Sequence, residues 1–571
     1  MSLFDENSPM DYDAIVVGTG ISGGWAAKEL TEKGLKVLVL ERGRNVKHIT
    51  DYKTANLDPW DLPNNDQPSQ EMLKDYEKQN RTGYVVKPSH VHWFVKDTEH
   101  PYSEKEGTRF DWIRGYHVGG RSLTWGRQSY RLSDLDFGAN LRDGIAVDWP
   151  IRYKDLAPWY SYVEKFAGIS GSKDGLSQLP DGEYLPPMEL TCVEKEMKKS
   201  IEKAFPERNL IIGRTAHIVG PTHQANRNTC QSRDRCMRGC PFGAYFSSLS
   251  ATLPAAEATG NMTLRPNSVV SEVLFDKEKG RATGVRVIDA ETKKDYVFTS
   301  KIIFLNASAI HSTAILMNSK SERFPNGMGN DSGELGHNIM DHHFRVMAEG
   351  DWEGHEDKYF KGRRPNGFYI PRFRNLDAKT KHPDFIRGYG FQGSATRHKW
   401  EDAVAEMGIG ADFKNNIMKP GPWKAGMNAF GEILPYHDNA MELNYDQLDA
   451  WGQPTITFST TIRDNEMKMR KDMAVTGAEM LEAAGFKNVR TKDDGFGIGL
   501  GIHEMGTARM GHDPKTSVLN KWNQVHGAPN VFVTDGAAMT SAGCQNPSLT
   551  YMALTARAAD FAVEELKKRN L

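Results

Sequence analysis

The most constraining feature of this sequence is a short apolar run that leads directly into a glycine-rich turn. Residues 13–18 (DAIVVG) are β-branched and apolar, which is typical of a strand buried on both faces. Residues 22–33 have a helical pattern that Gly34 ends, and residues 36–40 form a second apolar strand. The order strand, turn, helix and strand predicts a βαβ unit.

The turn, GTGISG from Gly18 to Gly23, has the spacing of a dinucleotide-binding turn. Gly18 permits a tight turn, Gly20 lets the backbone approach a pyrophosphate, and Gly23 lets the helix close on the strand. The helix N-terminus offers free N–H groups to phosphates. Glu41, at the end of the second strand, is placed to accept hydrogen bonds from an adenosine ribose. An ordinary glycine-rich turn is the alternative. The combination with strand, helix and acid favours a dinucleotide site without distinguishing FAD from NAD.

The length of 571 residues predicts two to four domains or one large two-domain enzyme, and it excludes a small binding module. Lys and Arg number 72 and Asp and Glu 74, so the formal net charge is −2 and there is no basic field for nucleic acid. No run approaches the roughly 18 to 20 apolar residues of a membrane helix, and the polar first residues lack the pattern of an export signal. We therefore expect no nucleic-acid partner, no membrane span and no signal peptide.

The rest of the chain alternates between strand-like and helical patterns. Residues 262–309 cluster apolar residues as strands do, and aromatic-rich runs over residues 345–461 predict an antiparallel sheet, a candidate substrate domain. Residues 465–484 and 547–569 are predicted helices. Residues 45–109 show little periodicity and are predicted to be long surface excursions.

Four stretches together resemble the glucose-methanol-choline (GMC) family of flavin oxidoreductases. They are GTGISGG near the start, HVGGRSLTWGRQSYR at 117–131, NASAIHSTAILMNS at 306–319, and the block from GIHEMGTARMG to CQNPSLTYMALTARAADF. The resemblance implies an α/β FAD-binding doubly wound (Rossmann-like) domain plus an α+β substrate domain with an antiparallel sheet. It places the FAD-binding domain at residues 11–340, including a cysteine loop near 222–245 and parts of the substrate domain. The substrate-binding domain follows at 341–490, and residues 491–571 return to the FAD domain with the catalytic residues.

The resemblance also implies which residues hold FAD. Val270 lies where such proteins hold adenine with a backbone group, and Asp535-Gly536 follows an apolar run, although an ordinary turn is the alternative there. The implied cofactor-binding residues are Gly18, Gly20, Gly23, Glu41, Arg42, Gly119, Gly120, Ser122, Thr124, Gly126, Val270, Asp535, Gly536, Asn546 and Pro547. The loop beside the flavin reads SLTWG, without the histidine that some sugar oxidases of the family link to FAD, so we expect noncovalent FAD.

A catalytic pair is implied near the C-terminus. His503 in HEMGT matches the active-site histidine of the family, and Asn546 in QNPS matches its His-or-Asn partner. Oxidation of an alcohol requires removal of the hydroxyl proton while hydride passes to flavin N5, and a neutral imidazole suits the first task. Asn546 is able to hold the same oxygen without adding charge. A structural role in a turn is the alternative for each residue alone.

Three of the five cysteines, Cys230, Cys236 and Cys240, form C-x5-C-x3-C followed by proline. Thiolates are ligands of iron–sulfur clusters, and the spacing is not that of paired zinc-ribbon cysteines. Cluster-bearing bacterial sugar dehydrogenases of the GMC family carry such a loop, and three ligands favour [3Fe-4S] over [4Fe-4S]. A fourth ligand from Cys192 or Cys544 would lie outside the motif. Zinc completed by a residue such as His223, buried free thiols, and a disulfide are the alternatives.

The resemblance is to the catalytic large subunit of bacterial FAD and iron–sulfur sugar dehydrogenases. We expect oxidation of a secondary alcohol of a sugar or glycoside, with C3 of glucosides as the best match, and electrons leaving through the cluster to a cytochrome c-type or other acceptor. A small signal-bearing subunit would bring the complex to the periplasm; without it the chain would be cytoplasmic. The alternatives are a GMC oxidase or dehydrogenase of another polyol, gluconate or alcohol with structural cysteines, and a nonenzymatic flavin and iron–sulfur electron-transfer component.

Overall fold

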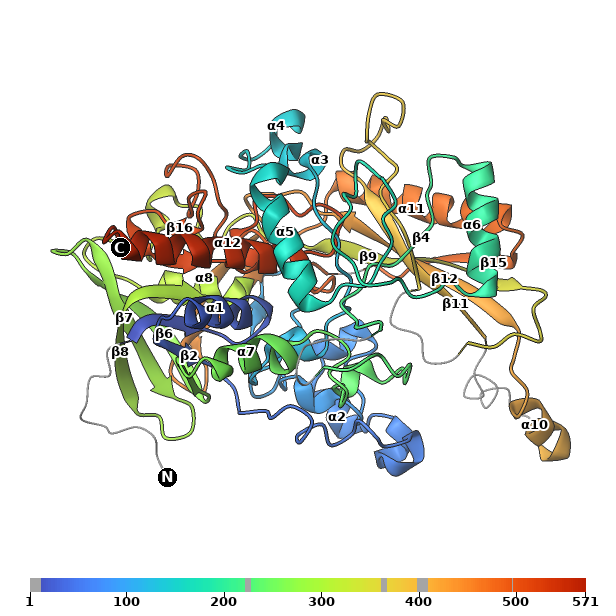
Figure 1. Ribbon diagram of the computed structural model, residues 1–571, viewed down its shortest axis with the longest axis horizontal. Coiled ribbons are helices and arrows are strands. Elements are labelled where there is room, and N and C mark those ends of the chain that lie inside the picture. The colour runs from blue at the N-terminus through green and yellow to red at the C-terminus, as the bar shows by residue number, and fades with distance from the viewer. Residues whose placement is uncertain (1–11, 221–226, 361–366, 398–408, 496) are drawn as a thin grey trace.

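The computed structural model describes residues 12–220, 227–360, 367–397, 409–495 and 497–571. Two sheet-based bodies lie end to end along the molecule (Figure 1). One body contains both the N-terminal and the C-terminal segments. The other contains a six-stranded sheet, with α10 (Gly410–Ile417) beyond it.

The first body is built on an eight-stranded sheet. Its strands are β1 (Tyr12–Val17), β2 (Val37–Leu40), β5 (Met262–Arg265), β6 (Ser268–Asp276), β7 (Arg281–Asp289), β8 (Asp295–Leu305), β16 (Gln524–Val525) and β17 (Ala528–Val533). The strands β17, β8, β1, β2 and β5 are parallel neighbours in that order, and β16 pairs antiparallel with β17 at the edge. The strands β6 and β7 form an antiparallel meander on β8. The predicted βαβ unit is confirmed, and β17 adds a C-terminal strand to the same sheet.

Both faces of the parallel strands are covered. Ala14 and Val16 of β1 share a core with α1 (Ile21–Glu32) and α12 (Ser548–Lys567). Ile15 and Val17 share another core with the β6–β7 meander and α8 (Ala309–Asn318). A strand buried on both faces cannot alternate apolar with polar residues, which explains the continuous run IVV.

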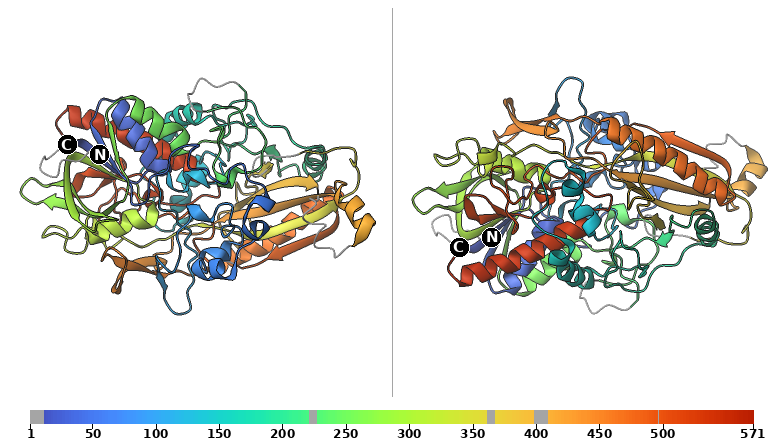
Figure 2. Two further views of the ribbon diagram at one scale, coloured as in Figure 1. Left: turned by 90° about the horizontal axis from the view of Figure 1, so that it is seen from below. Right: turned by 90° about the horizontal axis from the view of Figure 1, so that it is seen from above.

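The second body is an antiparallel sheet, in the order β15, β9, β12, β11, β10, β4. Its strands are β4 (Ile211–Ile212), β9 (His342–Trp352), β10 (Phe368–Ile370), β11 (Tyr389–Arg397), β12 (Trp423–Glu432) and β15 (Lys487–Asp493). The helices α6 (Cys192–Ala204) and α11 (Asp464–Ala483) contribute apolar side chains to the core of this sheet. Figure 2 shows α11 lying along the sheet. The predicted antiparallel sheet is therefore present, whereas the domain boundaries at 340 and 490 stay predictions.

The other elements are short or lie between the two bodies. They are β3 (Ser103–Glu104), β13 (Ala440–Leu448) and β14 (Pro454–Ser459) in a third sheet, the helices α2 (Gln70–Asp75), α3 (Asp134–Phe137), α4 (Ala139–Asp143), α5 (Tyr153–Ala167) and α7 (Leu253–Ala258), a π-helix η7 (Ser248–Thr252), and the 3₁₀ helices η1 (Pro59–Asp61), η2 (Pro63–Asp66), η3 (Gln79–Thr82), η4 (Val91–Trp93), η5 (Gly120–Leu123), η6 (Cys236–Arg238), η8 (Asn330–Ser332) and η9 (Gly536–Ala538).

The prediction that residues 45–109 are surface excursions was wrong in part. Val46, Tyr52, Val85 and Trp93 are buried in the core that also holds α1 and α12. Short 3₁₀ turns carry these side chains inward, and such turns have no periodicity that a sequence pattern could reveal.

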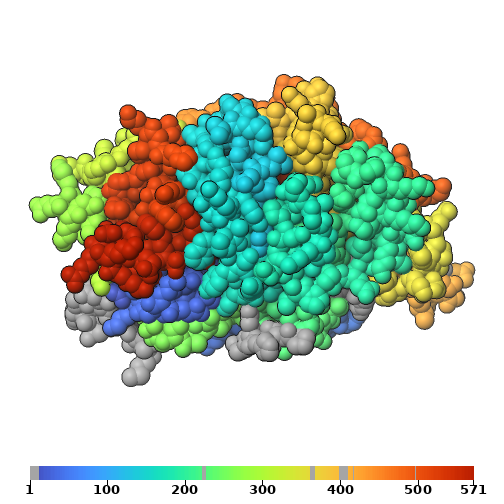
Figure 3. Space-filling model, turned by 45° about the horizontal axis from the view of Figure 1, so that its top comes forward, coloured from blue at the N-terminus to red at the C-terminus, as the bar shows by residue number. Residues whose placement is uncertain are grey.

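The two ends of the described chain meet in the first body. The helix α12 packs on α1, and Lys33 Nζ lies 2.7 Å from an Asp560 carboxylate oxygen. Figure 3 shows the blue N-terminal and red C-terminal regions side by side at one end of the molecule. Segments more than 500 residues apart therefore build one wall of the cofactor-binding body.

We expect Gly23→Ala to lower the free energy of unfolding by at least about 1–3 kcal/mol. A Cβ at Gly23 would lie 1.9 Å from the Gly18 carbonyl oxygen, a backbone atom that cannot rotate away. Thermal unfolding of the purified variant measures the loss as a lower Tm. Gly20→Ser is the matched control, because a Cβ there meets nothing within 4 Å and serine is a favoured N-cap. Equal losses of Tm in the two variants would contradict the close approach of helix and strand.

Candidate active site

A cavity of about 290 Å³ begins at the carboxyl ends of β1 and β2 and reaches the loop around η5. The expected cofactor-binding residues that line it are Gly18, Gly20, Glu41, Arg42, Gly120, Ser122, Thr124, Gly126, Val270, Asp535, Gly536 and Asn546. The other three expected residues lie behind its wall. Gly23 packs on Gly18, the Gly119 N–H donates to Thr19 Oγ1 at 2.9 Å, and Pro547 is the N-cap of α12.

Glu41 ties the glycine-rich turn to the second strand. Its Oε2 accepts the backbone N–H of Thr19 at 3.2 Å, and its Oε1 accepts the N–H of Gly43 at 3.0 Å. Burial raises the pKa of Glu41, while these hydrogen bonds oppose the rise. The carboxylate therefore stands at the cavity wall in a fixed orientation, as a ribose acceptor requires.

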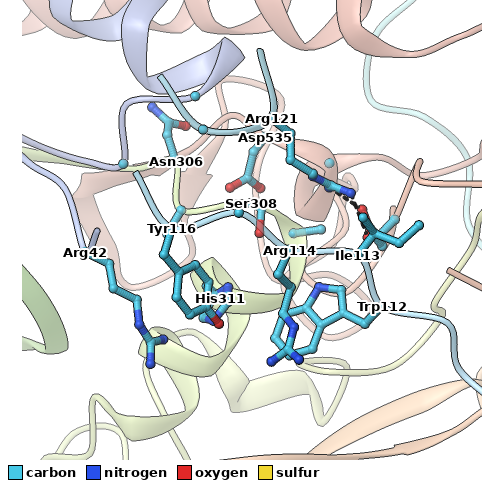
Figure 4. A pocket seen from close by; sticks show the side chains of 18 of the residues that line it. Arg42, Trp112, Ile113, Arg114, Tyr116, Arg121, Asn306, Ser308, His311 and Asp535 are labelled. Atoms are coloured by element: carbon cyan, nitrogen blue, oxygen red, sulfur yellow. Dashed lines mark hydrogen bonds and ion pairs between the residues drawn. The ribbon is translucent and has the colours of Figure 1, made fainter. Parts of the chain in front are cut away.

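Arg42 closes the same end of the cavity with residues from a distant loop. Its guanidinium lies 4.6 Å from the ring centre of Tyr116 and 4.7 Å from that of Trp451, and it forms an ion pair with Asp449 at 2.8 Å. Figure 4 shows Arg42 and Tyr116 beside His311, whose Nε2 lies 3.1 Å from the Tyr116 hydroxyl oxygen. The turn between β13 and β14 thus covers the end where an adenosine would lie.

The cavity wall carries polar atoms that other described residues do not satisfy. Nδ2 of Asn306 and the hydroxyl oxygen of Tyr551 are buried without a hydrogen-bond partner in the described part of the chain, and both residues line the cavity. Asp535 accepts from Ser312 Oγ at 2.5 Å and from the Ala537 N–H at 3.0 Å, and burial raises its pKa to about 6. Buried polar groups normally have partners, so Asn306 Nδ2 and the Tyr551 hydroxyl group fit a bound polar group such as a dinucleotide.

His503 and Asn546 meet at the cavity wall, as predicted. Asn546 Nδ2 lies 3.5 Å from His503 Nε2. Gln392 of β11 donates from Nε2 to Asn546 Oδ1 at 2.5 Å, which fixes the amide with its NH₂ toward the histidine. The C-terminal segment and the six-stranded sheet therefore join at this one pair.

His342, the first residue of β9, determines which nitrogen of His503 carries a proton. Nε2 of His342 lies 2.8 Å from the Gly543 carbonyl oxygen, and because a carbonyl only accepts, this nitrogen is protonated. Burial lowers the pKa of His342 to about 4, so the ring is neutral at pH 7 and its Nδ1 is an acceptor. Nδ1 of His503 lies 2.9 Å from that atom and donates to it.

The tautomer of His503 follows from this chain of hydrogen bonds. Burial above all, with His342 and Arg121, holds the pKa of His503 well below its ordinary value, so its ring is also neutral. With the proton on Nδ1, the lone pair is on Nε2, the atom that faces Asn546. This is the arrangement of a general base whose orientation is set by a neighbouring group.

A buried carboxylate holds both histidines in place. Asp341 accepts the backbone N–H groups of His342, Gly499, Gly501 and His503 at 2.7, 2.7, 2.9 and 3.0 Å. Burial and the nearby Glu504 raise the pKa of Asp341 to about 7, against the effect of the four donors. The loop before His503 is therefore fastened to the start of β9.

Several residues of the site were missed by sequence reasoning. Arg121, drawn in Figure 4, donates to both oxygens of Glu504 at 3.2 and 2.6 Å beside His503. Both lie inside stretches that carry the family resemblance, so a signal was present. His342 and Gln392 lie outside the four stretches that carry the resemblance, and no local motif marks them.

The three motif cysteines surround a second, smaller cavity. Cys230, Cys236, Cys240 and His217 line it, whereas Cys192 and Cys544 do not. All five cysteines are free thiols, so the disulfide alternative is not formed. Across the described ranges, no three or more His, Cys, Asp or Glu side chains converge to hold a metal ion. His223, the suggested zinc ligand, lies outside the described residues.

Arginines fasten the cysteine loop to the segment before α2. Arg233 donates to the Asn56 side-chain oxygen at 2.8 Å, Arg235 pairs with Asp58, and Arg238 donates to the Leu57 carbonyl oxygen at 2.7 Å. The loop ends are joined by backbone bonds, including one from Cys230 N–H to Ile218 O at 3.1 Å. The cysteine loop is therefore held by the arginine contacts on one side and by the backbone bonds at its ends on the other.

Five aromatic residues from the aromatic-rich runs of residues 345–461 do not line the large cavity. Tyr369, Tyr389, Phe391 and Trp423 are at most 1% exposed and belong to the hydrophobic cores, and Tyr436 bonds to Glu466. These side chains therefore pack the interior of the second body rather than the cavity.

Two models of the GMC oxidoreductase family match residues 12–344 and 435–555. The chain is 27% identical to 2-methyl-1,2-propanediol dehydrogenase of Mycolicibacterium austroafricanum, over 96% of this chain and 94% of that protein. It is 26% identical to the fructose dehydrogenase large subunit of Gluconobacter japonicus, over 98% and 99%. It is also 26% identical to paromamine 6'-oxidase of Streptomyces fradiae, over 98% and 92%.

A solved structure of formate oxidase from Aspergillus oryzae has the same fold. The TM-score is 0.61 at 15% identity, over 99% of this chain and 100% of that one. The family models cover both the glycine-rich turn and the segment that carries His503 and Asn546. The chain belongs to the GMC oxidoreductase family.

Proposed function

We propose that this GMC-family FAD oxidoreductase is a dehydrogenase of a secondary alcohol in a sugar or glycoside, with C3 of glucosides as the favoured position. The observation that carries the reaction class is the geometry of His503 and Asn546. An imidazole nitrogen that carries a lone pair and an amide N–H that faces it lie 3.5 Å apart at the cavity wall. Such a pair is complementary to one hydroxyl group.

A substrate hydroxyl between these side chains donates its proton to His503 Nε2 and accepts a hydrogen bond from Asn546 Nδ2. Gln392 keeps the amide in this orientation, because its own N–H occupies Asn546 Oδ1. The alcohol loses two electrons and two protons in all: the carbon-bound hydrogen leaves as hydride, and the hydroxyl proton passes to His503. Bound FAD supplies the hydride acceptor.

The chain holds FAD noncovalently in this proposal. The backbone at Gly18 and Gly20 with the N-terminus of α1 would bind the pyrophosphate, and Glu41 the ribose. His117, the histidine nearest the flavin loop, is buried outside the cavity, with Nδ1 3.0 Å from the Val118 carbonyl oxygen. No side chain in the SLTWG stretch offers a histidyl link.

The cysteine cavity is proposed to hold an iron–sulfur cluster, with [3Fe-4S] favoured. Each thiolate of a cluster binds a different iron, so three thiols around a cavity suit a cluster better than thiols converging on one ion. The location supports electron export, since Met237 lines the large cavity while the adjacent Cys236 lines the small one. Two consecutive residues therefore line different cavities, so a single turn of the chain separates the two sites.

A partner subunit and a one-electron acceptor complete the proposal. The fructose dehydrogenase large subunit is by its name a sugar enzyme and one part of an assembly, and it matches nearly the whole chain. We propose a small signal-bearing subunit, a cytochrome c-type acceptor and a periplasmic complex. None of the described helices is long and apolar enough to span a membrane.

A substrate panel tests the proposed reaction. We expect a glucoside to bleach the flavin absorbance under anaerobic conditions, with product NMR showing a carbonyl at C3 and acid precipitation releasing all the flavin. Fructose, gluconate and 2-methyl-1,2-propanediol serve as competitors. Bleaching by one of these instead would assign another alcohol, and no bleaching by any would favour the nonenzymatic electron-transfer alternative.

Substitutions of the two histidines test the base and its orientation. We expect His503→Ala to retain FAD and to lower kcat by about 10²–10⁴-fold, the usual contribution of a general base. His342→Leu removes the acceptor for His503 Nδ1–H and lowers kcat by about tenfold or more, because the lone pair can then move to Nδ1. His342→Gln is the matched rescue, since its amide both accepts and donates.

The pH profile gives an independent readout of the same pair. Because the pKa of His503 is depressed, its neutral form persists below pH 6.5, and activity should fall only as the pH drops beneath that ordinary histidine value. Steady-state kcat/KM against pH measures this limb. A limb above pH 6.5, or full activity in His342→Leu, would contradict the proposed tautomer.

Metal analysis tests the cluster. We expect iron and acid-labile sulfide in the purified protein, and their loss in Cys236→Ser, while substrate still bleaches the flavin and reduction of an external dye fails. Cys192→Ser is the matched control, because this half-buried cysteine lies outside the cysteine cavity. A protein without iron or sulfide, or with zinc in their place, would refute the cluster.

A further inference from the structure

Arg127 lies in the wall between the two cavities. Its side chain lines the large cavity, and its guanidinium lies 5.0 Å from the ring centre of Tyr245, which lines the cysteine cavity. The guanidinium also acts electrostatically on the Cys236 thiol. Only 1% of Arg127 is exposed, so solvent screens its charge little. The charge therefore acts on groups on both sides of the wall.

The guanidinium of Arg127 is poorly satisfied by the polypeptide. Its Nε and Nη1 atoms are buried and have no hydrogen-bond partner among the residues that the structure describes. The Tyr245 ring offers its π face to the cation but accepts no ordinary hydrogen bond. Leaving two buried donor atoms of a charged group unpaired costs free energy, so the position is unfavourable unless another acceptor is present.

The backbone adds a second cost at the same residue. Arg127 has φ 64°, in the left-handed region that a long side chain rarely adopts. Residues held in such conformations cluster at functional sites. Buried Arg131 nearby shows what a structural arginine looks like by contrast. Its guanidinium donates to both carboxylate oxygens of Glu164.

We propose that Arg127 is a positioning residue that places one fixed positive charge in the wall between flavin and cluster. The inference rests on the proposed iron–sulfur function. Hydrogen bonds to cluster sulfur and nearby charge set the reduction potential of such a centre. Because an added electron makes the cluster more negative, the cation favours the reduced form and draws electrons away from the flavin.

The test uses Arg127→Gln, which keeps an amide donor but removes the charge, and Arg127→Lys, which keeps the charge. Titration of the EPR signal of the holoenzyme measures the potential of the cluster. We expect Arg127→Gln to shift the equilibrium toward oxidised cluster by about tenfold, equivalent to about 59 mV for one electron. Arg127→Lys should recover most of this shift. Flavin bleaching by substrate should persist in both variants.

Arg235→Gln is the matched control. It removes the same charge from a residue that lines the cysteine cavity itself, but Arg235 is partly exposed and paired with Asp58, so a smaller shift is expected. An Arg127→Gln shift no larger than that of Arg235→Gln would overturn the proposal. Absence of iron and sulfide from the parent protein would instead overturn the cluster on which it rests.

A second measurement separates this role from a structural one. In a Cys236→Ser background, which lacks the cluster ligand, Arg127→Gln should raise Tm, because it removes an unpaired buried cation. If Arg127 only supported the fold, the same change would lower Tm. This measurement also decides the question if Arg127→Gln fails to assemble a cluster.

Discussion

The candidate active site depends on one buried carboxylate. Asp341 lies where the chain enters β9, and its oxygens collect backbone N–H groups from the start of that strand and from the loop that carries His503. Through these bonds the substrate sheet and the C-terminal segment keep one relative position. The hydrogen-bond chain from Gly543 through His342 to His503 is meaningful only because this position is held, since a shift of about an ångström would break it.

The fold could be predicted where the local sequence restricts the backbone to few conformations. The turn from Gly18 to Gly23 admits few alternatives, because both a positive φ and a missing Cβ are required there, and the structure confirms both. His503 and Asn546 could be singled out because each lies in a stretch with family resemblance, and the structure places their side chains together. His342, Gln392 and Arg127 act through contacts between distant segments, and their roles depend on orientations, tautomers and missing partners that no spacing encodes. The prediction for residues 45–109 was wrong in part for a related reason. Their burial depends on packing against distant segments, which no periodicity in the sequence reveals.

The cysteine loop and the flavin loop are organised as one unit. The turn η6 sends Cys236 to one cavity and Met237 to the other, while Arg127 and Tyr245 fill the space between. Arginines on the far side bind the loop to residues 55–58. The second cavity is thereby built from a loop outside the parallel sheet.

The placement of β17 beside β8, and of α12 on α1, has a consequence for how the molecule is made. The parallel sheet is incomplete until β17 and α12 have been synthesised. The N-terminal βαβ unit therefore leaves the ribosome with part of its apolar surface uncovered. Long-range pairing of this kind slows folding and leaves intermediates open to aggregation. Cofactor insertion is therefore expected only after β17 and α12 have been synthesised.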